Sequence, residues 1–239
     1  MKTKILLVFA IIAIFSVSAA GTARAAVIAT LYGTGTNGTQ GLETKDSHFT
    51  LISEPALANT TGPFITQATA GFPYPSAWIA DPSNAEWISP QKTYTASGAG
   101  DPEGDYEYQE TFSLAGYNPA DTVITGEIAT DNTLVSITLD GVTLTNAQLG
   151  AGFNYNNVTD NALTAFTISF TNNTFNSGIN TLDFTVDNGK GTTGNPTGLL
   201  VELSGTANTV VPEPSTVTVY ILGLFVLLGF AIRKKLIRI

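Results

Sequence analysis

Three acidic residues alternate along a short segment of the chain, in a pattern that could ligate calcium. Asp101, Glu103 and Asp105 are separated by Pro102 and Gly104, which are common turn residues. Ca²⁺ prefers hard oxygen ligands such as carboxylates. The segment lacks the twelve-residue EF-hand pattern, and a motif this short is a weak signal. Two interpretations stay open: a structural calcium site and, favoured over it, a solvated acidic turn before a strand.

Two tryptophans offer a second kind of chemistry, the stacking of aromatic rings on sugar faces. Trp78 and Trp87 both lie in the proline-rich segment 71–90. An exposed tryptophan suits sugar binding because its ring is large and flat. Buried aromatic side chains, however, are usual in a core of this size. The sequence therefore favours core positions for both tryptophans and keeps a sugar-binding platform as the alternative.

Catalytic chemistry has little support in the residue types. His48 is the only histidine, there is no cysteine, and no Gly-x-Ser-x-Gly segment occurs. A nucleophile elbow, a thiol nucleophile and a multi-histidine metal site are therefore excluded. Two carboxylates roughly 5 to 10 Å apart could cleave glycosides. The chain has many acidic residues, and their spacing in the sequence does not identify such a pair. We predict that the chain is not an enzyme, with a glycosidase as the last alternative.

Residues 26–205 carry the pattern of β-strands, which would have to position these side chains. Thr, Asn and Gly are abundant, and no segment keeps the 3.6-residue period of a helix. Apolar and polar residues instead alternate with period two. The alternation predicts strands over residues 49–52, 86–89, 106–114, 134–139, 142–144, 165–170, 181–186 and 199–203.

The predicted strands fit a sandwich of two sheets. Asp140 and Gly141 separate two of them and supply the positive φ angles of a tight hairpin. Alternation buries one face of each strand, as in two stacked antiparallel sheets. The predicted fold is therefore an all-β antiparallel sandwich, with a jelly roll as its topology. We expect one domain over residues 26–205.

The first 25 residues have the parts of a secretory signal peptide. Lys2 and Lys4 form the charged start, and residues 5–17 form an apolar run. Ala23 and Ala25 fit the small-x-small rule, which predicts cleavage after Ala25. An uncleaved anchor is the alternative, but the run is shorter than the ~20 residues that span a bilayer.

The C-terminal end begins with a linker and an apolar block. Residues 206–216 form a polar linker that contains Pro212, Glu213 and Pro214. The prolines fix φ and remove backbone donors, so neither a helix nor a sheet runs through them. Residues 217–232 are apolar and uncharged. They are predicted to form a transmembrane helix.

A basic block, residues 233–239, closes the chain. Arg233, Lys234 and Lys235 follow the apolar block directly. The positive-inside rule would keep them in the cytoplasm and leave everything before residue 217 outside the membrane. A plain C-terminal anchor with a proline hinge is the alternative, although a hinge does not need a glutamate between its prolines.

In this order the three blocks resemble the PEP-CTERM sorting signal of Gram-negative bacteria. The resemblance implies that an exosortase, a membrane cysteine transpeptidase, recognises Pro212, Glu213 and Pro214 and processes the tail. It also implies transient residence in the inner membrane, export to the cell surface or beyond, and an association with extracellular polysaccharide.

The middle of the chain resembles the galactose-binding-like jelly roll of carbohydrate-binding modules. The matching residues run from Trp78 and Trp87 through 104–114 to 129–141, and the Asp-Asn step before the hairpin is the most specific piece. The resemblance implies a jelly roll, a carbohydrate ligand and, often, a structural calcium in a loop. It carries over no ligand residue.

The predicted exported part is strongly acidic. Residues 26–211 hold three lysines and no arginine against eighteen acidic residues, a net charge of −15. Such a surface repels nucleic acid, since phosphate binding needs Lys and Arg. It favours solubility and can attract divalent cations. We therefore expect no nucleic-acid partner.

Three functions remain possible, and each predicts a different surface for the domain. A structural or adhesive matrix protein would show a Thr/Asn-coated surface with both tryptophans buried. A carbohydrate-binding module would show a concave sheet with exposed Trp or Tyr. A glycosidase would show an acidic cleft that holds a close carboxylate pair. The sequence favours the first function, an exported protein of the envelope or matrix.

Overall fold

A computed structural model describes residues 23–55, 61–68, 73, 77–94, 100–171, 174–190, 195–210, 223 and 225. Residues Ala25–Asn208 form one compact unit. The predicted sorting motif and basic block lie outside the described residues, as do most of the signal peptide and of the span 217–232. In the part of the chain that is described, no helix is long and apolar enough to cross a membrane.

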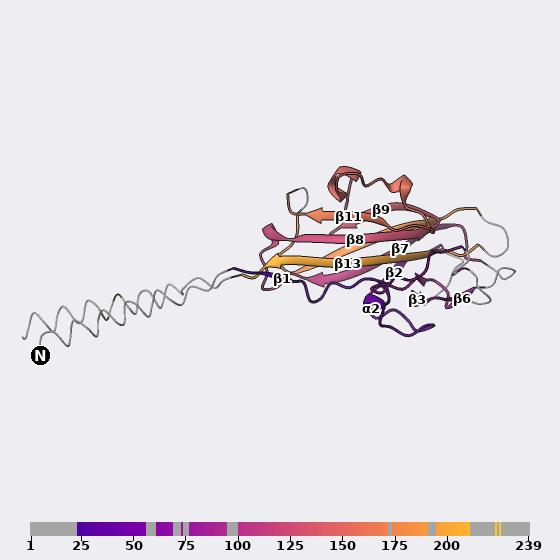
Figure 1. The fold of residues 1–239 in the computed structure, drawn as a ribbon, viewed down its shortest axis with the longest axis horizontal. Helices are drawn as coiled ribbons and strands as arrows, with labels where there is room; N and C mark the ends of the chain where they lie inside the picture. The colour runs from indigo at the N-terminus through magenta and orange to yellow at the C-terminus, as the bar shows by residue number, and fades with distance from the viewer. Residues whose placement is uncertain are drawn as a thin grey trace, which may run out of the picture. The chain divides into compact units, whose positions relative to one another are not determined.

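Six antiparallel strands form the first sheet. Their order is β11-β8-β13-β5-β3, and β1 also pairs with β13. Figure 1 shows β11, β8 and β13 lying side by side. The strands are β1 (Ala25–Val27), β3 (Phe64–Ile65), β5 (Ile88–Ser89), β8 (Val123–Asp131), β11 (Thr164–Ser169) and β13 (Gly198–Asn208).

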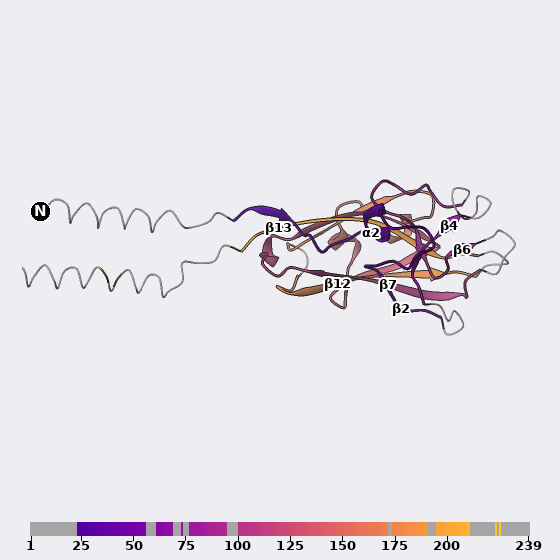
Figure 2. The same ribbon diagram turned by 90° about the horizontal axis from the view of Figure 1, so that it is seen from below.

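Five antiparallel strands form the second sheet, in the order β10-β9-β12-β7-β2. Seen from below, β13 lies in one layer and β12 and β7 lie in the other (Figure 2). The prediction of an all-β antiparallel sandwich is therefore confirmed. The strands are β2 (Thr50–Ser53), β7 (Gly104–Ser113), β9 (Thr133–Leu139), β10 (Val142–Thr143) and β12 (Ile179–Asn188).

Short elements complete the domain. β4 (Gln67–Ala68) and β6 (Thr93–Tyr94) form a small parallel pair. The element α2 (Thr34–Gly38) is a single tight turn, because four of its five residues have positive φ. Three 3₁₀ turns lie in the connections: η1 (Pro119–Asp121), η2 (Asn146–Leu149) and η3 (Tyr155–Asn157).

The predicted alternation is seen most clearly in β7 and at the β9–β10 hairpin. In β7, Tyr106, Tyr108 and Phe112 face the core and are at most 1% exposed. Asp140 and Gly141 have φ angles of 50° and 78°, so both turn residues lie in the left-handed region, as predicted.

One long strand, β8, was not predicted from the sequence. Its alternation is broken by Gly126, and Ala129 is buried although it faces away from the main core. The ring of Phe166 lies across Gly126, because a Cβ built at this glycine would be 2.4 Å from Phe166 Cζ. Position 126 therefore requires glycine. Because glycine has no apolar side chain, the period-two alternation that would predict β8 is interrupted there.

The prediction that the linker begins at residue 206 is wrong, because β13 continues to Asn208. The last core-facing positions of β13 are Gly205 and Ala207. Both are buried, but both residues are too small to give an apolar period in the sequence. β1 pairs with this end, with Ala25 opposite Asn208. Both ends of the compact unit therefore lie on neighbouring strands.

The core has two parts. The larger one lies between the sheets and includes Leu199 and Val201 of β13. The smaller one includes Leu200, the intervening residue, together with Ala129, Trp78 and other side chains from the segment 77–94. Successive residues of a strand point to opposite faces. The smaller core therefore covers part of the outer face of the six-stranded sheet.

Candidate functional site

Both tryptophans are buried at this outer face. Trp78 and Trp87 are each 1% exposed, and their rings stack with centroids 4.3 Å apart. Trp78 Nε1 donates a hydrogen bond to Asp131 Oδ2 (2.7 Å), and Trp87 Nε1 donates one to the carbonyl of Ile79 (3.0 Å). The alternative of an exposed sugar-stacking platform is therefore wrong for these two rings, and the favoured core positions are correct.

Asp101, the first predicted calcium ligand, points into the protein. Its carboxylate accepts hydrogen bonds from Gln91 Nε2 (2.8 Å), from the hydroxyl of Tyr94 and from the backbone N–H of Thr197 (3.0 Å). Burial raises the pKa of Asp101, and these hydrogen bonds act in the opposite direction. Asp101 thus joins three separate segments and has a structural role.

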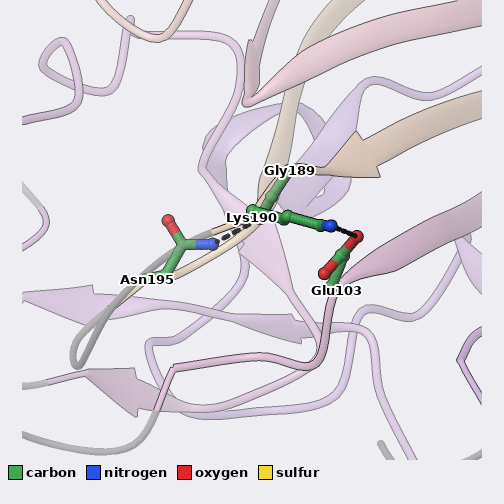
Figure 3. A network of polar contacts seen from close by, with 4 residues as sticks. All are labelled: Glu103, Gly189, Lys190 and Asn195. Atoms are coloured by element: carbon green, nitrogen blue, oxygen red, sulfur yellow. Dashed lines mark hydrogen bonds and ion pairs between the residues drawn. The ribbon is translucent and has the colours of Figure 1, made fainter.

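The other two predicted calcium ligands lie at the surface. Glu103 and Asp105 are exposed, and Glu103 Oε1 lies 4.0 Å from Lys190 Nζ (Figure 3). Beside this pair, Asn195 Nδ2 donates a hydrogen bond to the carbonyl of Gly189 (3.1 Å). Within the described residues, no three His, Cys, Asp or Glu side chains are grouped so that they could hold a metal ion. The predicted calcium ligands are therefore not brought together.

A polar hollow of about 390 Å³ opens where β8 passes into β9. Asp131 ends β8 and lies in its wall, followed by Asn132. Asn156 of η3 and the turn residue Asp160 also line it, and Thr133, Tyr155 and Thr159 add hydroxyl groups. These side chains offer carboxylate and amide groups, which suit hydrogen bonding to a hydroxyl-rich ligand.

The electrostatics of the hollow come from two acids. Burial raises the pKa of Asp131 to about 6, repulsion from Asp160 and Asp101 acts in the same direction, and the Trp78 hydrogen bond opposes it. Burial also raises the pKa of Asp160. Asp131 Oδ1 accepts a hydrogen bond from Asn132 Nδ2 (2.7 Å), so both of its oxygens have protein partners.

One buried acid was missed in the sequence. Glu110 of β7 is 0% exposed, and its Oε1 accepts a hydrogen bond from the backbone N–H of Tyr32 (3.1 Å). Its Oε2 has no hydrogen-bond partner. Burial raises the pKa of Glu110 to about 8. The alternation could have revealed it, since Glu110 falls on the same face as Tyr108 and Phe112.

The single histidine contacts Tyr32, the residue whose backbone N–H binds Glu110. The ring of His48 stacks on Tyr32 with centroids 3.6 Å apart. Its backbone N–H donates to Asp46 Oδ1 (2.8 Å) in a turn before β2. This placement agrees with an ordinary surface residue.

Comparisons with known proteins identify no family. No protein-family model matches the sequence, and no curated protein matches it. Among solved structures, the C-terminal extracellular domain of Mycobacterium tuberculosis EmbC is 15% identical with a TM-score of 0.28. The match covers 70% of this chain and 56% of that one, so this chain spans little more than half of that domain. A likeness at this level carries no functional argument.

Proposed function

We propose that the protein is an exported, non-enzymatic β-sandwich of the cell envelope or extracellular matrix, with a structural or adhesive role linked to exopolysaccharide. Its sandwich is of the galactose-binding-like jelly-roll class. A PEP-CTERM signal holds it transiently in the inner membrane until an exosortase-type membrane protease processes the tail.

The position of the compact unit carries this proposal. β1 begins at Ala25, the last residue of the predicted signal peptide, and β13 ends at Asn208, four residues before Pro212. Removal of the two predicted targeting segments would take only the exposed Ala25 from the compact unit and leave its core intact. A sorting motif must also be open to an enzyme, and prolines favour this because they disfavour helices and sheets.

The surface supports adhesion more than aromatic sugar binding. No tryptophan or tyrosine among the described residues is exposed. The exposed large apolar side chains in that part are aliphatic apart from Phe170 and Phe225. The outer faces instead carry hydroxyl, amide and carboxylate groups, which favour solubility and multiple weak contacts.

Carbohydrate binding in the polar hollow is the second candidate, because carboxylate and amide groups converge there. Asn156 is exposed at its rim and is the simplest position to change. Asn156→Ala should then weaken binding of neutral oligosaccharides on a glycan array. Equal signals from the variant and the unaltered protein would remove this candidate.

The sorting step can be tested with one substitution. Glu213→Ala should leave the full-length chain in the inner-membrane fraction, because the processing enzyme no longer recognises its motif. Glu103→Ala removes the same charge from the domain surface and should be exported normally. Export of both variants in equal amounts would contradict the proposal.

A further inference from the structure

The outer face of the six-stranded sheet is covered at one end and open at the other. Leu200 and Ala129 pair across β13 and β8 beneath the two tryptophans. The next outward-facing pair is Glu202 and Glu127, followed by Ser204 and Thr125. These two pairs line a groove of about 580 Å³. The segment that covers the sheet therefore stops where the groove begins.

A pair of carboxylates occupies the covered end of this groove. Glu202 and Glu127 are directly opposite in the antiparallel register. In the described part of the chain, neither carboxylate has a hydrogen-bond or ion-pair partner. Burial raises the pKa of Glu202, and repulsion from Glu127 adds to the effect. Like charges opposite each other destabilise a sheet, and a cation placed between them would reverse that repulsion.

The rest of the lining is mixed: small and polar side chains lie beside larger apolar ones, Val27, Ile28, Leu31, Phe166 and Leu203. On β11, Ala165 lies opposite Glu127 and Thr167 lies opposite Thr125. Asn37 and Asn84 contribute amides from the neighbouring loops. Among the described residues, no lysine, arginine or histidine lines the groove. Hydroxyls, amides and apolar side chains together suit a polymer whose units carry both hydroxyls and C–H faces.

We infer that this groove binds a polysaccharide that carries protonated amino groups, with Glu127 and Glu202 contacting the ammonium. Charge complementarity selects this occupant, because the groove offers two unpaired carboxylates and no cation. On the strands themselves, the small side chains of Thr125, Ala165 and Ser204 leave room for an extended chain. This inference deepens the proposed matrix role by naming the ligand, and it rests on that role.

The test uses the exported protein purified from producing cells, with a glucosamine hexamer as the probe at mildly acidic pH. Combined Glu127→Gln and Glu202→Gln should weaken binding roughly tenfold, since two partly exposed ion pairs are lost. The fully N-acetylated hexamer, which has no charge, should bind no better than this double variant. Added salt should weaken binding to the unaltered protein.

A matched control separates a site from general attraction to an acidic protein. Combined Glu43→Gln and Asp105→Asn removes the same two charges from exposed positions outside the groove and should bind the hexamer normally. Equal losses in both double variants, equal binding of the acetylated hexamer, displacement by calcium, or no binding would each overturn the inference. Release of reducing ends would overturn it in favour of a glycosidase. None of these results affects the export proposal, which is tested by locating the Glu213→Ala variant in cell fractions.

Discussion

At the scale of single residues, the acids of this protein divide by burial and not by sequence spacing. Asp101 and Glu103 are two residues apart, yet the first is 8% exposed and holds three segments together, while the second lies at the surface. A buried carboxylate is stable only when hydrogen bonds replace its water. Asp101 has three such bonds, from Gln91, Tyr94 and Thr197.

Removing Asp101 should therefore be costly. Asp101→Ala leaves the N–H of Thr197 without an acceptor and the buried hydroxyl of Tyr94 with only the carbonyl of Thr197 at 3.4 Å. The substitution should lower the free energy of unfolding by roughly 2 to 4 kcal/mol. Asp105→Ala, at an exposed position, is the control and should leave the melting temperature unchanged. EDTA should shift neither melting curve. A fall in melting temperature with EDTA that Asp105→Ala abolishes would restore the calcium interpretation.

Glu110 should make the stability depend on pH. Its pKa is raised from an ordinary 4.5 to about 8, so between these values the folded protein holds a proton that the unfolded chain has released. The stability from this group is complete below the lower value and decreases as the pH rises toward the upper one. At about 1.4 kcal/mol for each pKa unit, the loss is on the order of a few kcal/mol.

Urea unfolding measured near pH 5 and near pH 8 tests this dependence. The unaltered protein should be more stable at the acidic value, and Glu110→Gln, which cannot titrate, should show a clearly smaller difference. Identical pH dependence in the two proteins would show that Glu110 does not hold its proton in the fold.

At the scale of elements, strands with a bulky apolar face could be predicted and strands with small residues could not. β7, β9, β11, β12 and β13 were all expected, because alternating large side chains give a period of two. β8 was not expected, since Gly126 stands where the ring of Phe166 needs space. The end of β13 was also missed, because Gly205 and Ala207 face the core there.

The packing at Gly126 provides a sharp test of β8. A Cβ at this position would lie 2.4 Å from Phe166 Cζ and 2.7 Å from the carbonyl oxygen of Glu202. Gly126→Ala should therefore destabilise the fold by roughly 2 to 3 kcal/mol through overpacking. Gly178→Ala, where nothing lies within 4 Å of the added Cβ, is the matched control. Equal stability of the two variants in urea would contradict the placement of β8 against β11.

At the scale of the whole molecule, the residue pattern predicted the sandwich but not its candidate sites. Burial of both tryptophans was the favoured expectation, because aromatic residues dominate cores. The opposition of Glu127 and Glu202 depends on the register of two strands 75 positions apart. The polar hollow likewise depends on how η3 meets the end of β8. Such long-range pairings have no signature in one sequence.

The central claim is that a finished domain lies between two removable targeting segments. The pairings of Ala26 with Ala207 and of Val27 with Thr206 close this domain, and in the sequence Pro212, Glu213 and Pro214 follow its last strand. If both segments are processed, the exported protein loses Ala25 from the end of β1, keeps the rest of the sandwich and loses its predicted membrane anchor.

Mass spectrometry of both ends of the mature protein from its native host tests this claim most directly. The predicted protein begins at Ala26 and lacks everything after about Pro214. An intact C-terminus that ends in Arg238 and Ile239 would contradict sorting and reduce the tail to an ordinary anchor.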